Sequence, residues 1–113
     1  MLFEFCLHQM PDPERVIEHA RALAPDIVVL DHAPSSVWSW YAAEEEKVGA
    51  AWKAAEKWPI RRWRAVEASQ EFRDFGELEA RLASQGPASR ERLRPFRGHA
   101  PISIPMPYWL ALL

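Results

Sequence analysis

Apolar positions at the start of the chain predict a strand followed by a helix. Met1–Leu7 is apolar and rich in aromatic residues, which favours a strand. Asp12 is a good N-cap, and an apolar stripe at helical spacing then predicts a helix over Pro13 to Leu23. Pro25 ends this helix, because the residue before a proline avoids the helical conformation.

A second strand follows directly. Asp26 leads into Ile27–Leu30, an uninterrupted run that contains three β-branched residues. Such a run is typical of a strand covered on both faces in a parallel sheet. Residues 1–30 therefore predict a strand–helix–strand unit with two parallel strands and a right-handed crossover.

The remaining pattern predicts three further helices and two further strands. Ser36 can cap a long helix, and Glu44, Glu45 and Glu46 mark its solvent-exposed face. Arginines mark Ile60–Val66 as an exposed edge strand. The predicted elements are a helix over about Val37–Trp58, a strand over Ile60–Val66, helices over about Phe75–Leu82 and Ala88–Phe96, and a final strand over Tyr108–Leu113.

About four strands and four helices in 113 residues indicate one α/β domain spanning residues 1–113. So short a chain leaves two strands at sheet edges, so the sequence looks like part of a larger sheet. Hydrophobic residues make up 49% of the chain, which is enough for a core. The formal charge of -2 argues against a nucleic-acid binder.

The single cysteine, Cys6, excludes an intrachain disulfide and a cysteine-built zinc site, which favours a reducing, cytoplasmic location. Its apolar strand context predicts an inert core thiol rather than a nucleophile. No apolar stretch is long enough to span a bilayer, so no membrane segment is expected.

Two segments carry a resemblance to a known family. Leu7–Glu14 reads LHQMPDPE, and Val29–His32 reads VLDH after a predicted strand. In this order they resemble the C-terminal half of class I S-adenosylmethionine-dependent methyltransferases of the type 11 kind. The Pro105–Tyr108 run before the final strand is similar to the ending of some members.

The resemblance covers nearly the whole chain and implies a partial Rossmann-like sheet, the cofactor S-adenosylmethionine and a small-molecule methyl acceptor. It implies that Leu7 and His8 lie against the cofactor. The chain departs from the family in one respect: its four glycines are isolated, and no G-x-G-x-G turn is present. Backbone must approach such a cofactor closely at this turn, so the resemblance implies only the substrate-side half of an enzyme. The other half would come from an upstream segment or a partner subunit.

Candidate site residues follow the two predicted parallel strands. Ligands of open α/β sheets bind beyond the carboxyl ends of the strands, where His8 and His32 are expected to face one cleft. A neutral imidazole there could accept a proton from the methyl acceptor, so both histidines are candidate catalytic residues. Gln9 and Asp31 are candidate substrate contacts. The alternative is that the two histidines only cap strand ends by hydrogen bonding.

Aromatic residues after the second strand are further candidates. Trp38 and Tyr41 share one helical face and could form the wall of a substrate pocket, or could simply pack the helix. Trp40 is expected to point away from them. A metal site built from two histidines and a carboxylate is disfavoured, because adjacent Asp31 and His32 should point to opposite faces of a strand.

A second function class remains open. The chain could be a non-catalytic interaction subunit that lacks the cofactor site and uses its exposed first strand to pair with another subunit or copy. Within Met1–Leu7 only Glu4 is charged, which predicts a homodimer or larger assembly.

Overall fold

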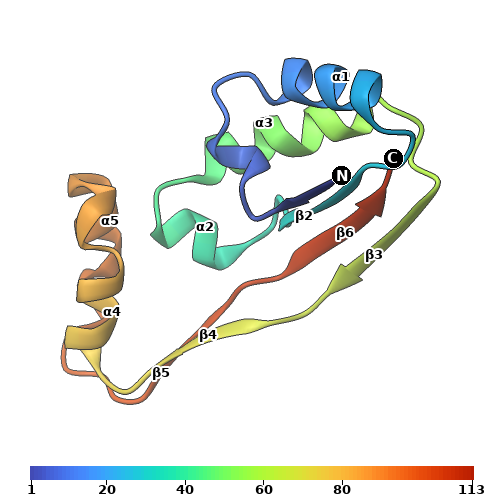
Figure 1. Ribbon diagram of the computed structural model, residues 1–113. Helices are drawn as coiled ribbons and strands as arrows, with labels where there is room; N and C mark the ends of the chain where they lie inside the picture. Colours follow the sequence, from blue (N-terminus) through green and yellow to red (C-terminus); the bar gives the residue numbers. More distant parts are fainter.

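The computed structural model describes residues 1–113 and contains a four-stranded mixed sheet (Figure 1). Strands β1 (Leu2–Glu4) and β2 (Val28–His32) pair in parallel, with α1 (Pro13–Leu23) between them in the chain. Strand β6 (Tyr108–Leu112) pairs antiparallel with both β2 and β3 (Arg62–Val66). The strand order is therefore β1-β2-β6-β3, with β1 and β3 at the edges. The predicted parallel unit and the predicted edge position of β3 are confirmed, and the chain is α/β.

Helices cover one face of this sheet. The row Phe3, Val29 and Ala111 lies in register across three strands, and all three side chains are buried. Helices α1 and α3 (Glu45–Glu56) lie side by side over this face (Figure 1). The main core contains Phe3, Leu7, Ile17, Ala20, Ile27, Val29, Ala51, Ala54, Ala55, Trp109, Ala111 and Leu113.

The opposite face of the sheet is open. Its apolar side chains alternate with the buried ones along each strand, as the period of two requires. Leu2 is 60% exposed and Leu110 37% exposed. Val28 and Leu30 of β2 are only half-buried, so the expectation that this strand is covered on both faces is wrong within the chain.

A two-stranded ribbon continues from the end of β3 and leads back into the start of β6. Strands β4 (Ser69–Phe72) and β5 (Ile102–Pro105) pair antiparallel and carry α4 (Phe75–Arg81) and α5 (Pro87–Leu93) at the far end (Figure 1). Two short 3-10 turns, Ala83–Gln85 and Arg94–Phe96, flank α5. A second core there contains Trp38, Ala42, Phe72, Leu78, Leu82, Leu93, Ile102 and Ile104. Strand β4 was not expected, whereas the prolines at 101, 105 and 107 restricted the segment of β5 to an edge strand or an irregular entry.

Two predicted elements are shorter than expected. The long helix predicted over residues 37–58 is two helices, α2 (Val37–Tyr41) and α3, because Ala43 adopts a φ of 58° between them. The first strand ends at Glu4, since Phe5 has a φ of 49°, and a 3-10 turn over Leu7–Gln9 follows. Left-handed backbone at these two residues cannot continue a helix or a strand.

Candidate functional site

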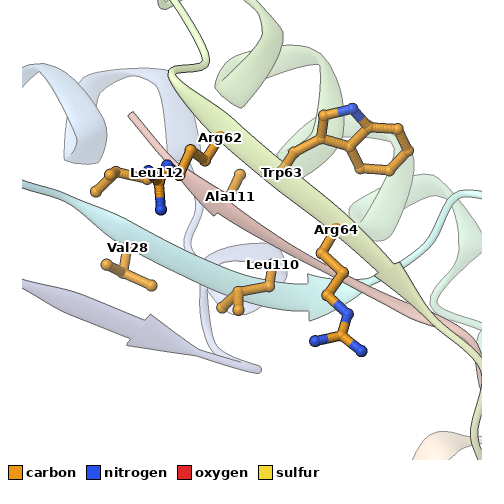
Figure 2. Close-up of a pocket in the computed structure, with 7 residues that line it drawn as sticks. All are labelled: Val28, Arg62, Trp63, Arg64, Leu110, Ala111 and Leu112. Carbon is orange, nitrogen blue, oxygen red and sulfur yellow. The ribbon is translucent and has the colours of Figure 1, made fainter.

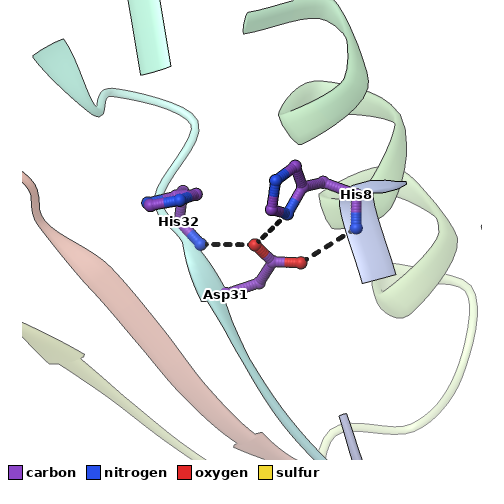
Figure 3. A group of neighbouring side chains, drawn as sticks. All are labelled: His8, Asp31 and His32. Atoms are coloured by element: carbon purple, nitrogen blue, oxygen red, sulfur yellow. Dashed lines mark hydrogen bonds and ion pairs between the residues drawn. The ribbon is translucent and has the colours of Figure 1, made fainter. Parts of the chain in front are cut away.

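The carboxyl ends of β1 and β2 bring a buried polar cluster together, and this cluster is the candidate active site (Figure 3). His8 lies on the 3-10 turn that follows β1, and Asp31 and His32 are the last two residues of β2. The three residues are 4%, 0% and 7% exposed. The imidazole centroids of His8 and His32 are 5.2 Å apart, so the predicted proximity of the two histidines is confirmed.

Asp31 organises the cluster through three hydrogen bonds. Its Oδ1 is 2.7 Å from His8 Nδ1 and accepts the backbone N–H of His32 at 2.8 Å. Its Oδ2 accepts the backbone N–H of His8 at 3.0 Å. One carboxylate thus fixes both the ring and the backbone of His8 against the end of β2 (Figure 3). Asp31 is fully buried, so it holds the histidines in place. It has no exposed surface with which to make the predicted contact to a substrate.

Glu44 is the site residue that the sequence reasoning missed. It was assigned to a solvated helix face, yet its side chain is 13% exposed and its Oε2 lies 3.1 Å from His8 Nε2. Gln9 and Gln85 both donate to Glu44 Oε1, at 3.0 and 2.7 Å. Glu44 lies in the break between α2 and α3, and a run of three glutamates gives no sign of which one turns inward. His8 therefore lies between two carboxylates.

The two histidines differ in protonation. Burial disfavours the charged form of His8, but the hydrogen bonds to Asp31 and Glu44 and their negative charges outweigh it and raise its pKa to about 9. The bond from His8 lowers the pKa of Glu44 to about 2. Burial, and then the positive charge of His8, lower the pKa of His32. At neutral pH, His8 is an imidazolium clamped by carboxylates and His32 is a neutral imidazole.

The cluster also meets the geometric outline of a metal site. The expectation that Asp31 and His32 would diverge too far is wrong, because possible ligand atoms of His8, Asp31 and His32 all lie within 4.8 Å of one another. Both ring nitrogens of His8, however, already face carboxylates. A metal ion would have to displace the His8 proton and the bonds that hold it. The donor set therefore fits a proton-holding network better than a metal centre.

Access to the cluster is narrower than the sequence predicts. His8 lines an open groove of about 450 Å³ between its own turn and α3, together with Gln9, Met10, Pro11, Pro13, Glu46, Lys47 and Ala50. His32 does not line this groove. Its Nδ1 is buried without a hydrogen-bond partner, and its ring lies 5.0 Å from that of Phe5. The two rings are neighbours, but they do not share one open cleft.

The remaining predicted site residues lie in three different places. Leu7 is fully buried in the main core, so its side chain cannot touch a cofactor. Gln9 is exposed and lies at the rim of the cluster, with its Nε2 2.9 Å from His8 Nε2. Trp38 stacks on Phe72 in the second core, and Tyr41 packs against it there, which is the packing alternative.

Trp40 does not turn away from Tyr41 as predicted, because the two rings pack edge to face with their centroids 5.0 Å apart. Trp40 is 46% exposed, and the guanidinium of Arg92 lies 4.6 Å from its ring centroid. Arg92 also pairs with Glu45, which ties α5 to the start of α3.

Comparisons with known proteins add no family. No family model, no curated protein and no solved structure matches this chain. None of its helices combines the length and the apolar character needed to cross a membrane.

Proposed function

We propose that this chain is the substrate-facing half of an S-adenosylmethionine-dependent small-molecule methyltransferase. The observation that carries the proposal is the buried His8–Asp31–His32 cluster at the carboxyl ends of two adjacent parallel strands, next to the unpaired edge of β1. Such strand ends are where open α/β sheets bind their ligands. The free edge leaves room for further strands that would carry the cofactor, as the resemblance of the LHQMPDPE and VLDH segments implies.

The opposed pKa values assign different roles to the two histidines. A neutral imidazole can accept a proton, so His32 is the proposed base for an N–H or O–H methyl acceptor. His8 holds its proton at neutral pH, and both of its ring nitrogens face carboxylates, so its proposed role is to hold the cluster in place rather than to touch the acceptor. Methyl transfer itself would be an in-line displacement at the sulfonium, favoured by positioning and by exclusion of water.

Calorimetry with S-adenosylmethionine on the purified chain tests the proposal. Binding at micromolar concentration that S-adenosylhomocysteine displaces and adenosine does not would support it. His32→Ala should leave this binding unchanged, because His32 is assigned to the acceptor and not to the cofactor. No binding at millimolar cofactor, together with a stable assembly that buries β1, would contradict the proposal.

A second function is favoured by the same free edge. Strand β1 carries apolar Leu2 at 60% exposure and is unpaired on its outer side. A chain without a Gly-rich turn could use this edge to pair with another subunit as a non-catalytic interaction protein. A stable assembly that buries β1, together with no cofactor binding, would support this function over the first.

A further inference from the structure

The open face of the sheet is an ordered surface of apolar and charged rows. Strand register places Leu2, Val28, Leu112 and Arg62 in one row across β1, β2, β6 and β3. The next row is Glu4, Leu30, Leu110 and Arg64. The two central strands thus contribute only Leu and Val to these rows, while the charges stand on the two edges.

This face is exposed in the single chain. Leu110, near its centre, is 37% exposed, and both arginines are exposed. A shallow groove of about 320 Å³ runs between Val28, Leu110, Leu112 and the edge arginines (Figure 2). Helices α1 and α3 both lie on the other side of the sheet. A contiguous exposed apolar surface with a charged rim is typical of an interaction site, so this surface calls for a partner.

The charges of this face are also unpaired. Glu4, Arg62 and Arg64 take part in no ion pair. Negative charge therefore lies only at the β1 edge of the face, and positive charge only at the β3 edge. A partner that complements this surface must carry the opposite arrangement.

The geometry points to a second copy of this chain as that partner, packed sheet against sheet. A two-fold axis parallel to the strands, placed over the gap between β2 and β6, sets β1 of one copy above β3 of the other. This rotation does not change the position of a residue along the strand direction. Glu4 of one copy therefore meets Arg64 of the other. Leu30 then lies over Leu110, and Val28 over Leu112. One operation matches the apolar centres and sets Glu4 against Arg64 at both edges, while Arg62 of each copy lies over Leu2 of the other.

The fit agrees with how sheets pack. Sheets in sandwiches lie about 10 Å apart with strand directions within about 30° of each other, which the long side chains of Glu4 and Arg64 can span. The four short strands give a patch smaller than the roughly 800 Å² per partner of standard interfaces. We therefore expect a monomer–dimer equilibrium with a Kd on the order of 100 μM rather than a permanent dimer. The dimer is independent of methyl transfer, and failure of cofactor binding would not affect it.

Charge reversal with rescue tests the arrangement, measured by sedimentation equilibrium and light scattering at several chain concentrations. Glu4→Arg and Arg64→Glu should each weaken dimerisation by about tenfold, because each creates two like-charge contacts per dimer. The double variant should restore the dimer to within a few-fold of the wild type. Glu79→Arg, the same charge change on exposed α4, should have no effect.

Leu110→Glu separates this interface from pairing through the β1 edge. It buries charge at the centre of the open face but leaves the edge of β1 untouched, so it should abolish the dimer. Circular dichroism checks that the variant is folded, and the charge pair provides a second test that does not alter the apolar centre. A monomer at all concentrations, a dimer that survives Leu110→Glu, or a double charge variant that is not restored would each overturn the proposal.

Discussion

Raising the pH above neutrality should destabilise this protein by discharging a single buried side chain. The pKa of His8 is about 9 in the folded chain, against an ordinary value of 6.5. At about 1.4 kcal/mol per pH unit, that difference corresponds to about 3 kcal/mol of folding free energy. Because the folded pKa is the higher one, this contribution is complete below pH 6.5 and is lost as the pH rises to 9.

The other two groups of the cluster act on the acidic side. The pKa of His32 is lowered on folding, so its neutral form stabilises the fold above pH 6.5 and this contribution is lost as the pH falls. The lowered pKa of Glu44 adds stability that is present above pH 4.5 and is lost as the pH falls towards 2. We therefore expect the maximum of stability near pH 6.5.

Urea unfolding followed by tryptophan fluorescence, repeated between pH 5 and 9.5, measures this profile. The free energy of unfolding should fall by about 3 kcal/mol between pH 6.5 and 9. His8→Gln should be less stable at pH 6.5 and should lose most of the basic slope. His19→Gln, on the exposed side of α1, is the matched control and should keep it. A flat wild-type profile, or a His8→Gln variant with the full slope, would refute the clamped imidazolium.

Substitutions at three further positions test separate parts of the fold by urea denaturation. Asp12→Ala should cost about 1 kcal/mol by removing the bond from the Arg15 N–H to its side chain, whereas Asp12→Asn should cost less; equal effects would contradict the cap. Ala43→Gly should stabilise by about 1 kcal/mol, because Ala43 has a φ of 58°, and a loss of stability would contradict this reading. Asp31→Ala should cost about 3 kcal/mol or more and lower the pKa of His8, followed by NMR titration; an unchanged His8 pKa would mean that Glu44 alone holds the proton.

Local signals predicted the elements whose ends are set by local chemistry. Helix α1 has the predicted bounds, because its N-cap, its first-turn proline and the proline after it are all read from neighbouring residues. The parallel pairing of β1 with β2 followed from the strand–helix–strand pattern. The proximity of His8 and His32 followed from that pairing, since parallel strands end on the same edge of a sheet.

What the sequence could not predict depends on contacts between distant residues. Nothing in the Ala- and Glu-rich segment around Ala43 disfavours a continuous helix. The break lies where Glu44 reaches His8, Gln9 and Gln85, residues 35 to 41 positions away in the chain. The raised pKa of His8 was invisible for a related reason, because it depends in part on Glu44, a carboxylate that the helical pattern assigned to solvent.

The ribbon of β3–β4 and β5–β6 makes the region beyond the sheet separable from it in design and in evolution. Strands β3 and β6 pair directly, from Arg62 opposite Leu112 to Val66 opposite Tyr108. The 41 residues from 67 to 107 therefore leave the sheet and return to it at one point. Insertions, deletions or a transplanted module can change that segment without altering the register of the four strands. The outer helices can thus diversify while the histidine cluster at the strand ends stays fixed.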